Sequence, residues 1–199
     1  PDFAGADLRS LRFCMSGGAP CPLPLMARWA ERGLTFKQGY GLTEAGVNCL
    51  TLPEDYAVSH RGSVGFPNWG TQARIVDEQG QEVGPEQVGE LWLAGPTLCS
   101  GYWQRPDASA ALFVGPWLQT GDLFRRDADG FYYVVDRKKD LYISGGENVY
   151  PAELETHLRE HPEVVDCAVI GVADDRWGEV GCAFVVLRDF YGTTQVVVE

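Results

Sequence analysis

Six consecutive residues, GYGLTE at positions 39–44, combine groups that could hold a magnesium nucleotide. The glycines on either side of Tyr40 let the backbone bend while the ring stays presented, and a flat aromatic ring can stack on a base. Thr43 offers a hydroxyl to a phosphate oxygen, and Glu44 offers the hard oxygen ligand that Mg²⁺ prefers. Taken alone, the same residues also fit a glycine-rich loop with a half-buried tyrosine.

Two shorter motifs could contact the same kind of ligand. Residues 16–20 (SGGAP) form a turn after residues 8–15, which resemble a short strand. Ligands of α/β sheets gather at the carboxyl ends of strands, although a tight connection explains this turn more simply. Residues 120–122 (TGD) place Asp122 where its carboxylate could accept two hydrogen bonds from a ribose. An Asx turn is the more common reason for such a tripeptide.

Five consecutive charged residues at 136–140 interrupt two apolar runs. Desolvating several ions costs several kcal/mol each, so this run must lie at a surface, a crevice or a domain boundary. The glycine pair at 145–146 then gives backbone freedom, and a helix is expected over residues 151–160 with Leu154 and Leu158 on one face. This order predicts the start of a second domain.

The elements around these motifs predict an α/β chain with a β-rich subdomain, followed by the start of a small α+β domain. A strand over residues 8–15, a helix over 24–32 and a strand over 34–38 form the α/β part. Strands over residues 72–76 and 89–94, joined by a hairpin-like loop, begin the β-rich part.

Three later aromatic residues could either pack in the core or contact a ligand. Tyr102 and Trp103 close the β-rich part and are expected in its core. Strands over residues 164–172 and 182–187 complete the last part, and Trp177 lies in the polar loop between them. This tryptophan could contact a ligand or pack on its own domain.

Composition narrows the class of protein. The net charge of -12 argues against a nucleic-acid surface, which needs a Lys/Arg footprint. The six cysteines include no CxxC pair and are expected to be reduced in a cytoplasmic protein, and the histidines show no metal-ligand spacing with them. No apolar run approaches the roughly 18 residues of a membrane span. The chain lacks an initiator Met and a signal-peptide pattern, and we expect it to be a piece of a longer protein.

The order of the motifs is more specific than any one of them. The chain resembles the acyl-adenylate-forming superfamily of acyl-CoA synthetases, adenylation domains and luciferases over about residues 8–187. The motifs that carry the resemblance are SGGAP at 16–20, QGYGLTE at 38–44, GEL at 89–91, TGD at 120–122 and the stretch from DR to PAELE at 136–155. The sequence SGGENVYP at 144–151 is similar to the fatty-acyl and aryl CoA ligase branch. Luciferases and coumarate ligases typically carry lysines where Ile143 and Gly145 stand here.

The resemblance implies an ATP-dependent acyl-CoA ligase. Such enzymes make an acyl adenylate from a carboxylate and Mg-ATP, release pyrophosphate, and pass the acyl group to the thiol of coenzyme A. The implied partners are a fatty or aryl acid, ATP and coenzyme A, with Mg²⁺ as cofactor, in fatty-acid and lipid metabolism. Residues 1–138 would be the C-terminal part of the large AMP-binding domain, with an α/β portion at 1–62 and a β-rich portion at 63–138. Residues 139–199 would begin the small C-terminal domain.

The resemblance also implies roles for individual residues. Thr43 and Glu44 are the implied catalytic residues, with Thr43 at the α-phosphate and Glu44 holding Mg²⁺. Tyr40 would stack on adenine, and Asp122 would bind the ribose hydroxyls with Arg137 beside them. The other implied nucleotide-binding residues are Gly18, Ala19, Pro20, Gln38, Gly39 and Gly41. The implied hinge between the domains is Lys139, and the implied coenzyme A contacts are Gly145, Gly146 and Trp177.

Two features of the family are missing from these residues. The Ser/Thr/Gly-rich phosphate loop does not appear, and no lysine follows Lys139. Losing one preorganised cation at developing phosphate charge costs on the order of 10² to 10³ in rate. The alternative hypothesis is therefore a catalytically inactive, truncated nucleotide-binding module. The sequence sets neither the carboxylic acid nor the oligomeric state.

Overall fold

The computed structural model describes residues 3, 5–19, 21–188 and 193–198. The chain forms two compact units: unit 1 contains Pro1–Thr120 and Phe124–Val134, and unit 2 contains Gly121–Leu123 and Val135–Glu199. The units interleave in sequence, so no single point of the chain separates them. The predicted domain boundary between residues 138 and 139 stays a prediction.

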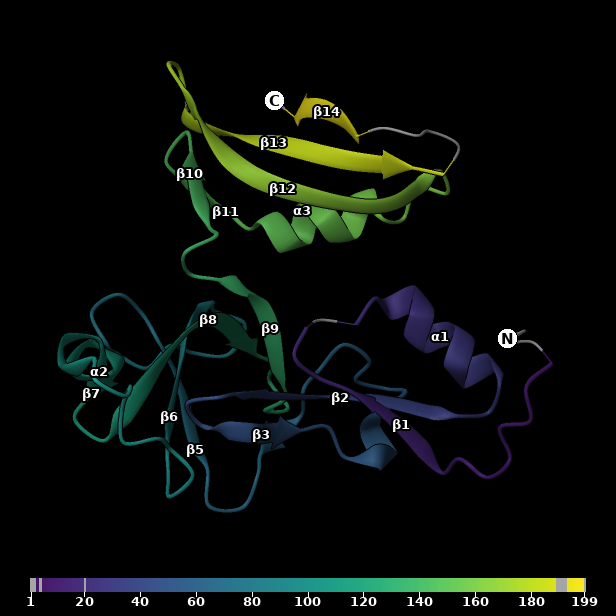
Figure 1. Cartoon of the computed structure of the whole chain (residues 1–199), viewed down its shortest axis with the longest axis horizontal. Helices are drawn as coiled ribbons and strands as arrows, with labels where there is room; N and C mark the ends of the chain where they lie inside the picture. The colour runs from purple at the N-terminus through teal and green to yellow at the C-terminus, as the bar shows by residue number, and fades with distance from the viewer. Residues whose placement is uncertain (1–2, 4, 20, 189–192, 199) are drawn as a thin grey trace. The chain divides into compact units, whose positions relative to one another are not determined.

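The first sheet of unit 1 has the strand order β1-β2-β3-β4 (Figure 1). The parallel pair β1 and β2 is connected through helix α1, as the α/β prediction requires, and the remaining pairs are antiparallel. Met26 is the buried residue of α1. The elements are β1 (Phe13–Ser16), α1 (Leu23–Glu31), β2 (Thr35–Leu42), β3 (Gly46–Thr51), a 3₁₀ turn (Glu54–Tyr56) and β4 (Phe66–Pro67).

A second sheet has the order β5-β6-β8-β7, and β9 pairs with β8; its residues belong to unit 1 except for residues 121–123 of β8 and 135–137 of β9. The predicted hairpin-like pair β5 and β6 is confirmed as antiparallel. Every residue of β6 is buried, and Leu91 and Leu93 share one core with Leu50 and Phe124. The elements are β5 (Gln72–Val76), β6 (Gly89–Ala94), α2 (Pro106–Leu112), β7 (Phe113–Val114), β8 (Trp117–Arg126) and β9 (Tyr132–Arg137).

Unit 2 is a sheet of order β11-β10-β13-β12, with β14 paired to β13. Leu154 and Leu158, the predicted apolar face of helix α3, pack against a core that includes Tyr142 and Val169. Figure 1 shows α3 lying along β12. The elements are β10 (Tyr142–Ser144), β11 (Glu147–Val149), α3 (Pro151–Leu158), β12 (Val164–Asp174), β13 (Gly178–Leu187) and β14 (Thr193–Val198).

Three sequence predictions about local structure are wrong. The strand expected over residues 8–15 begins only at Phe13, because the Leu11 N–H donates to the Leu8 carbonyl at 2.9 Å and closes a turn there. The strand expected over residues 34–38 runs to Leu42, because the glycine motif continues β2 through a register shift rather than forming a loop. Tyr102 and Trp103, expected in the core, are 41% and 87% exposed. They lie in the loop that leaves β6 and enters α2, outside the sheet that forms the core.

The cysteines and the helices bear on the predicted class of protein. All six cysteines are free, as expected, and burial raises the pKa of the Cys49 and Cys167 thiols. Among the residues that the structure describes, no helix is long and apolar enough to cross a membrane. The cytoplasmic location stays a prediction.

Tyr133 in β9 predicts a loss of stability at high pH. Burial, and then donation of its hydroxyl to Asp127 Oδ2 at 3.0 Å, raises the pKa of Tyr133 to about 12. An unfolded tyrosine has a pKa of about 10. The folded state therefore holds this proton more tightly, and the resulting stability is complete below pH ~10 and declines between pH ~10 and ~12.

Urea unfolding at a series of pH values tests this prediction. The stability of Tyr133→Phe should fall less steeply than that of the wild type above pH ~10. Tyr56→Phe, at a residue that is 42% exposed, is the control for the chemical change from tyrosine to phenylalanine. Parallel curves for the wild type and Tyr133→Phe would contradict the prediction.

Candidate functional site

The turn after β1 is tied to β2 by Gln38. This side chain is buried, and its Oε1 accepts a hydrogen bond from the Cys21 N–H at 2.8 Å. Gly18 and Ala19 are exposed, and Gly18 has φ +84°, which favours glycine. Gln38 therefore holds the turn that Gly18 and Ala19 belong to. Pro20, also predicted to bind nucleotide, lies outside the described residues.

The glycines of the GYGLTE motif have a packing reason of their own. A Cβ on Gly39 would lie 2.7 Å from Asn48 Oδ1 and 3.1 Å from the Leu50 carbonyl oxygen. A Cβ on Gly41 would lie 2.4 Å from the carbonyl carbon of Val47. Both glycines thus let β3 approach β2, whatever their role toward a nucleotide.

Tyr40 lies between these glycines and is half-buried. Its ring meets the edge of the Phe124 ring, with centroids 4.9 Å apart and an interplanar angle of 78°. This contact with Phe124 in the core restricts the orientation of the Tyr40 ring.

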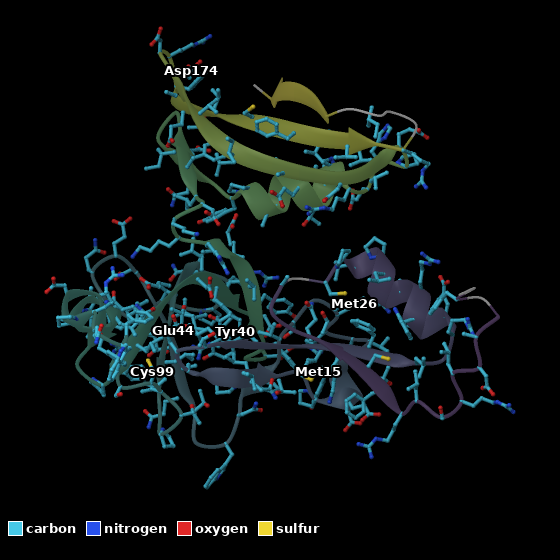
Figure 2. The ribbon with its side chains drawn as sticks, viewed as in Figure 1. Met15, Met26, Tyr40, Glu44, Cys99 and Asp174 are labelled. Carbon is cyan, nitrogen blue, oxygen red and sulfur yellow. The ribbon has the colours of Figure 1, made fainter. Side chains whose placement is uncertain are left out.

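Thr43 and Glu44 lie in the turn between β2 and β3. Thr43 is exposed, and Glu44 Oε1 accepts a hydrogen bond from the Tyr102 hydroxyl at 2.6 Å. That bond is the main reason why the pKa of Tyr102 is raised. The backbone carbonyl of Glu44 accepts from the Cys99 N–H at 2.7 Å, and Figure 2 shows these two residues side by side. The sequence predicted Glu44 and missed both of these partners.

Unit 2 brings Asp122 and Arg137 together. Arg137 Nε lies 3.6 Å from Asp122 Oδ1, and the Asp122 side chain is 17% exposed while that of Arg137 is 61% exposed. The Lys138 N–H donates to the Gly121 carbonyl at 2.9 Å, which holds the two segments in register. The recessed carboxylate can accept hydrogen bonds from hydroxyl groups, and the exposed guanidinium beside it can attract an anion.

The charged run at 136–140 ends β9 and enters an exposed turn that contains Lys139. Asp136 has a role that the sequence analysis missed. Its Oδ2 accepts from the Ala152 N–H at 2.9 Å, so it satisfies a free donor in the first turn of α3. The hinge role of Lys139 stays a prediction.

Gly145 and Trp177, both predicted to contact coenzyme A, touch each other in unit 2. The Gly145 N–H donates to the Trp177 carbonyl at 2.9 Å, and a Cβ on Gly145 would lie 2.8 Å from Trp177 Cε3. Trp177 is 47% exposed, and the Arg176 guanidinium lies 4.7 Å from its ring centroid. Gly146 has φ +89° and open space at its Cβ position. Asp174, labelled in Figure 2, accepts from the backbone N–H of Trp177 at 2.8 Å.

A family model described as AMP-binding enzyme matches residues 1–103. The chain belongs to the AMP-binding enzyme family. A second model, described as the AMP-binding enzyme C-terminal domain, matches residues 153–199 of this AMP-binding enzyme.

Similar proteins extend well beyond this chain. Feruloyl-CoA synthase of Amycolatopsis sp. is 48% identical over 189 residues, which is 95% of this chain and 38% of that protein. The structure of o-succinylbenzoate coenzyme A synthetase from Bacillus subtilis, in complex with ATP and magnesium ion, has a TM-score of 0.82 and 38% identity. It is matched over 93% of this chain and 40% of that one.

A third similar protein is an anthranilate CoA ligase in complex with anthranoyl-AMP. Its TM-score is 0.85 at 35% identity, over 97% of this chain and 37% of that one. These structures confirm the predicted fold class, a partial adenylate-forming fold. This AMP-binding enzyme thus spans about two fifths of the length of these relatives.

Proposed function

We propose that this AMP-binding enzyme is part of an ATP-dependent CoA ligase for an aromatic carboxylic acid. In the first half-reaction a carboxylate oxygen attacks the α-phosphorus of ATP, and the bond to the pyrophosphate oxygen breaks. In the second, the coenzyme A thiol loses its proton and its sulfur attacks the acyl carbon, so that AMP leaves. The placement of Asp122 beside Arg137 carries the proposal, since it pairs a recessed hydroxyl acceptor with a cation.

The nucleotide roles are proposed from the resemblance, and contacts inside each unit are compatible with them. In unit 1, the Tyr40 ring would stack on adenine, with its other contact fixed by Phe124. Gly18 and Ala19 would line the adenine side of the turn that Gln38 holds. In unit 2, the Asp122 carboxylate would accept from the ribose hydroxyls.

The donor set of the Thr43 and Glu44 turn fits Mg²⁺. This ion is usually held by one or two carboxylates together with substrate phosphates and waters. Among the described residues, no group of three or more His, Cys, Asp or Glu side chains is placed to hold a metal ion by itself. Glu44 would therefore bind Mg²⁺ jointly with the nucleotide, and Thr43 would donate to a phosphate oxygen. The ion would supply charge neutralisation at the phosphates.

The Gly145 and Trp177 contact is proposed to meet the thiol arm of coenzyme A. The missing side chain at Gly145 lets this backbone lie against the partly exposed indole, and Gly146 next to it has open space at its Cβ position. A narrow apolar arm could pack on such a surface while Arg176 offers positive charge to the phosphates of coenzyme A.

The aromatic acid is proposed from the relatives. Their names specify feruloyl, succinylbenzoate and anthranilate groups, and none of these is a fatty acyl chain. The fatty-acid and lipid role expected from the sequence is therefore not confirmed. We favour aromatic acids, and the partners that follow are this acid, ATP and coenzyme A.

Calorimetric titration with AMP and Mg-ATP, together with a pyrophosphate-release assay, tests the proposed function. The acids to compare are ferulate, o-succinylbenzoate and anthranilate against octanoate and palmitate. We expect AMP binding, and any pyrophosphate release should be confined to the aromatic acids. AMP binding without release would favour the non-catalytic nucleotide-binding module for this chain. A folded sample that binds neither nucleotide would overturn the proposal.

A further inference from the structure

The Glu44 carboxylate has a partner from a distant segment of unit 1. The Tyr102 hydroxyl donates to Glu44 Oε1 at 2.6 Å. This length falls in the range of charge-assisted O–H···O⁻ bonds, which are about twice as strong as bonds between neutral groups. Tyr102 was expected in the core, yet the residue is 41% exposed and its hydroxyl donates to an acidic side chain.

The backbone around Tyr102 is held from two sides. The Tyr102 N–H donates to Ser109 Oγ at 2.8 Å, and Ser109 Oγ donates to the Arg105 carbonyl at 2.7 Å in the first turn of α2. On the other side, the Cys99 N–H donates to the Glu44 backbone carbonyl at 2.7 Å. These bonds hold the segment against α2 and against the Glu44 turn independently of the Tyr102 hydroxyl.

Gly101 shows how closely this segment approaches α2. Its φ is +132°, and a Cβ there would lie 2.8 Å from Ser109 Oγ. A side chain at this position would displace Ser109 and with it the Tyr102 backbone. The close packing of Gly101 on Ser109 thus helps to keep Tyr102 at the Glu44 carboxylate.

We infer that Tyr102 is a positioning residue that orients the Glu44 carboxylate toward the magnesium ion of the bound nucleotide. This inference rests on the proposed function. A glutamate side chain in a turn can rotate about several bonds. Losing that freedom when the ion binds costs conformational entropy and so lowers the affinity for the ion. The hydroxyl fixes one carboxylate oxygen in advance. As a neutral donor it orients the carboxylate without supplying a competing positive charge.

Calorimetric titration of ATP with and without Mg²⁺ tests the inference on Tyr102→Phe. This variant keeps the ring and removes only the hydroxyl. We expect its Mg-ATP affinity to fall on the order of tenfold, as for other groups that orient a metal ligand. Its affinities for AMP and for ATP in EDTA should stay at the wild-type values, because the hydroxyl acts only through Glu44.

Two further variants separate positioning from a general structural effect. Tyr56→Phe makes the same chemical change on a ring that is 42% exposed, and it should bind Mg-ATP like the wild type. In a Glu44→Gln background, Tyr102→Phe should cause no further loss of Mg-ATP affinity. The inference is overturned if Tyr102→Phe weakens AMP and Mg-ATP equally, if it changes neither, or if its effect persists without the Glu44 carboxylate. Absence of any nucleotide binding by the wild type would overturn the proposed function and, with it, this inference.

Discussion

Asp122→Asn should weaken AMP binding by roughly 10- to 100-fold while leaving the protein folded. Under the proposed function, the Asp122 carboxylate accepts hydrogen bonds from the ribose hydroxyls. Bonds to a charged group contribute about 1.5–3 kcal/mol each, and about 1.4 kcal/mol is a factor of ten in affinity. The amide of asparagine keeps the shape of the side chain and removes its charge. The loss of AMP affinity therefore measures the hydrogen bonds between the carboxylate and the ribose.

Stability is expected to change little in the same variant. The partner cation, Arg137, is 61% exposed, and exposed ion pairs typically contribute about 0–1 kcal/mol. Asp129→Asn, at an exposed turn position of unit 1, is the matched control for the chemical change. It should bind AMP like the wild type and unfold at the same urea concentration.

A change of ligand tests the ribose role directly. The wild type should bind AMP more tightly than the 2′-deoxy and 3′-deoxy analogues, because each analogue lacks one hydroxyl donor. Asp122→Asn should discriminate less, since the carboxylate that reads the hydroxyls is gone. Equal loss of affinity for all three ligands would show that Asp122 acts elsewhere, and unchanged AMP affinity would remove it from the nucleotide site.

The sequence predicts well what depends on local pattern and on motif order. The short alternating runs at residues 72–76 and 89–94 give β5 and β6 with the same bounds. The face shared by Leu154 and Leu158 does pack on the core of unit 2. Asp122 and Arg137 were paired by resemblance, and the structure brings them within 3.6 Å. Their role toward a nucleotide stays a prediction.

The sequence misses contacts that depend on how distant segments come together. Nothing in the GYW sequence at 101–103 shows that its tyrosine meets Glu44, because that contact is set by the path of the loop between β6 and α2. Asp136 read as one member of a solvated charged run, although it caps the backbone of α3. Both residues are polar side chains whose partners come from other elements. The available signals were a tyrosine beside a glycine and an aspartate at the start of a charged run, and both patterns are too common to identify these contacts.

At Gly41, both nucleotide binding and strand packing would explain why a glycine is needed. The resemblance assigns it to nucleotide binding, and the structure shows that its Cβ would lie 2.4 Å from the Val47 carbonyl carbon and 2.6 Å from the Gly46 carbonyl oxygen. These are backbone atoms of the hairpin and cannot move aside like the end of a flexible side chain. Gly41→Ala should therefore destabilise unit 1 by about 1–3 kcal/mol, the usual cost of overpacking.

Gly84→Ala is the matched control, because its nearest neighbour to a Cβ is Gln87 Oε1 at 3.5 Å. Urea unfolding followed by tryptophan fluorescence should place Gly84→Ala at or slightly above the wild type, since alanine restricts the unfolded chain. AMP affinity measured well below the unfolding transition then separates the two explanations for Gly41. Lower stability with unchanged AMP affinity would assign the glycine to strand packing. Unchanged stability with weakened AMP binding would contradict the packing argument and assign it to the nucleotide, because the hairpin would then have tolerated the added methyl group.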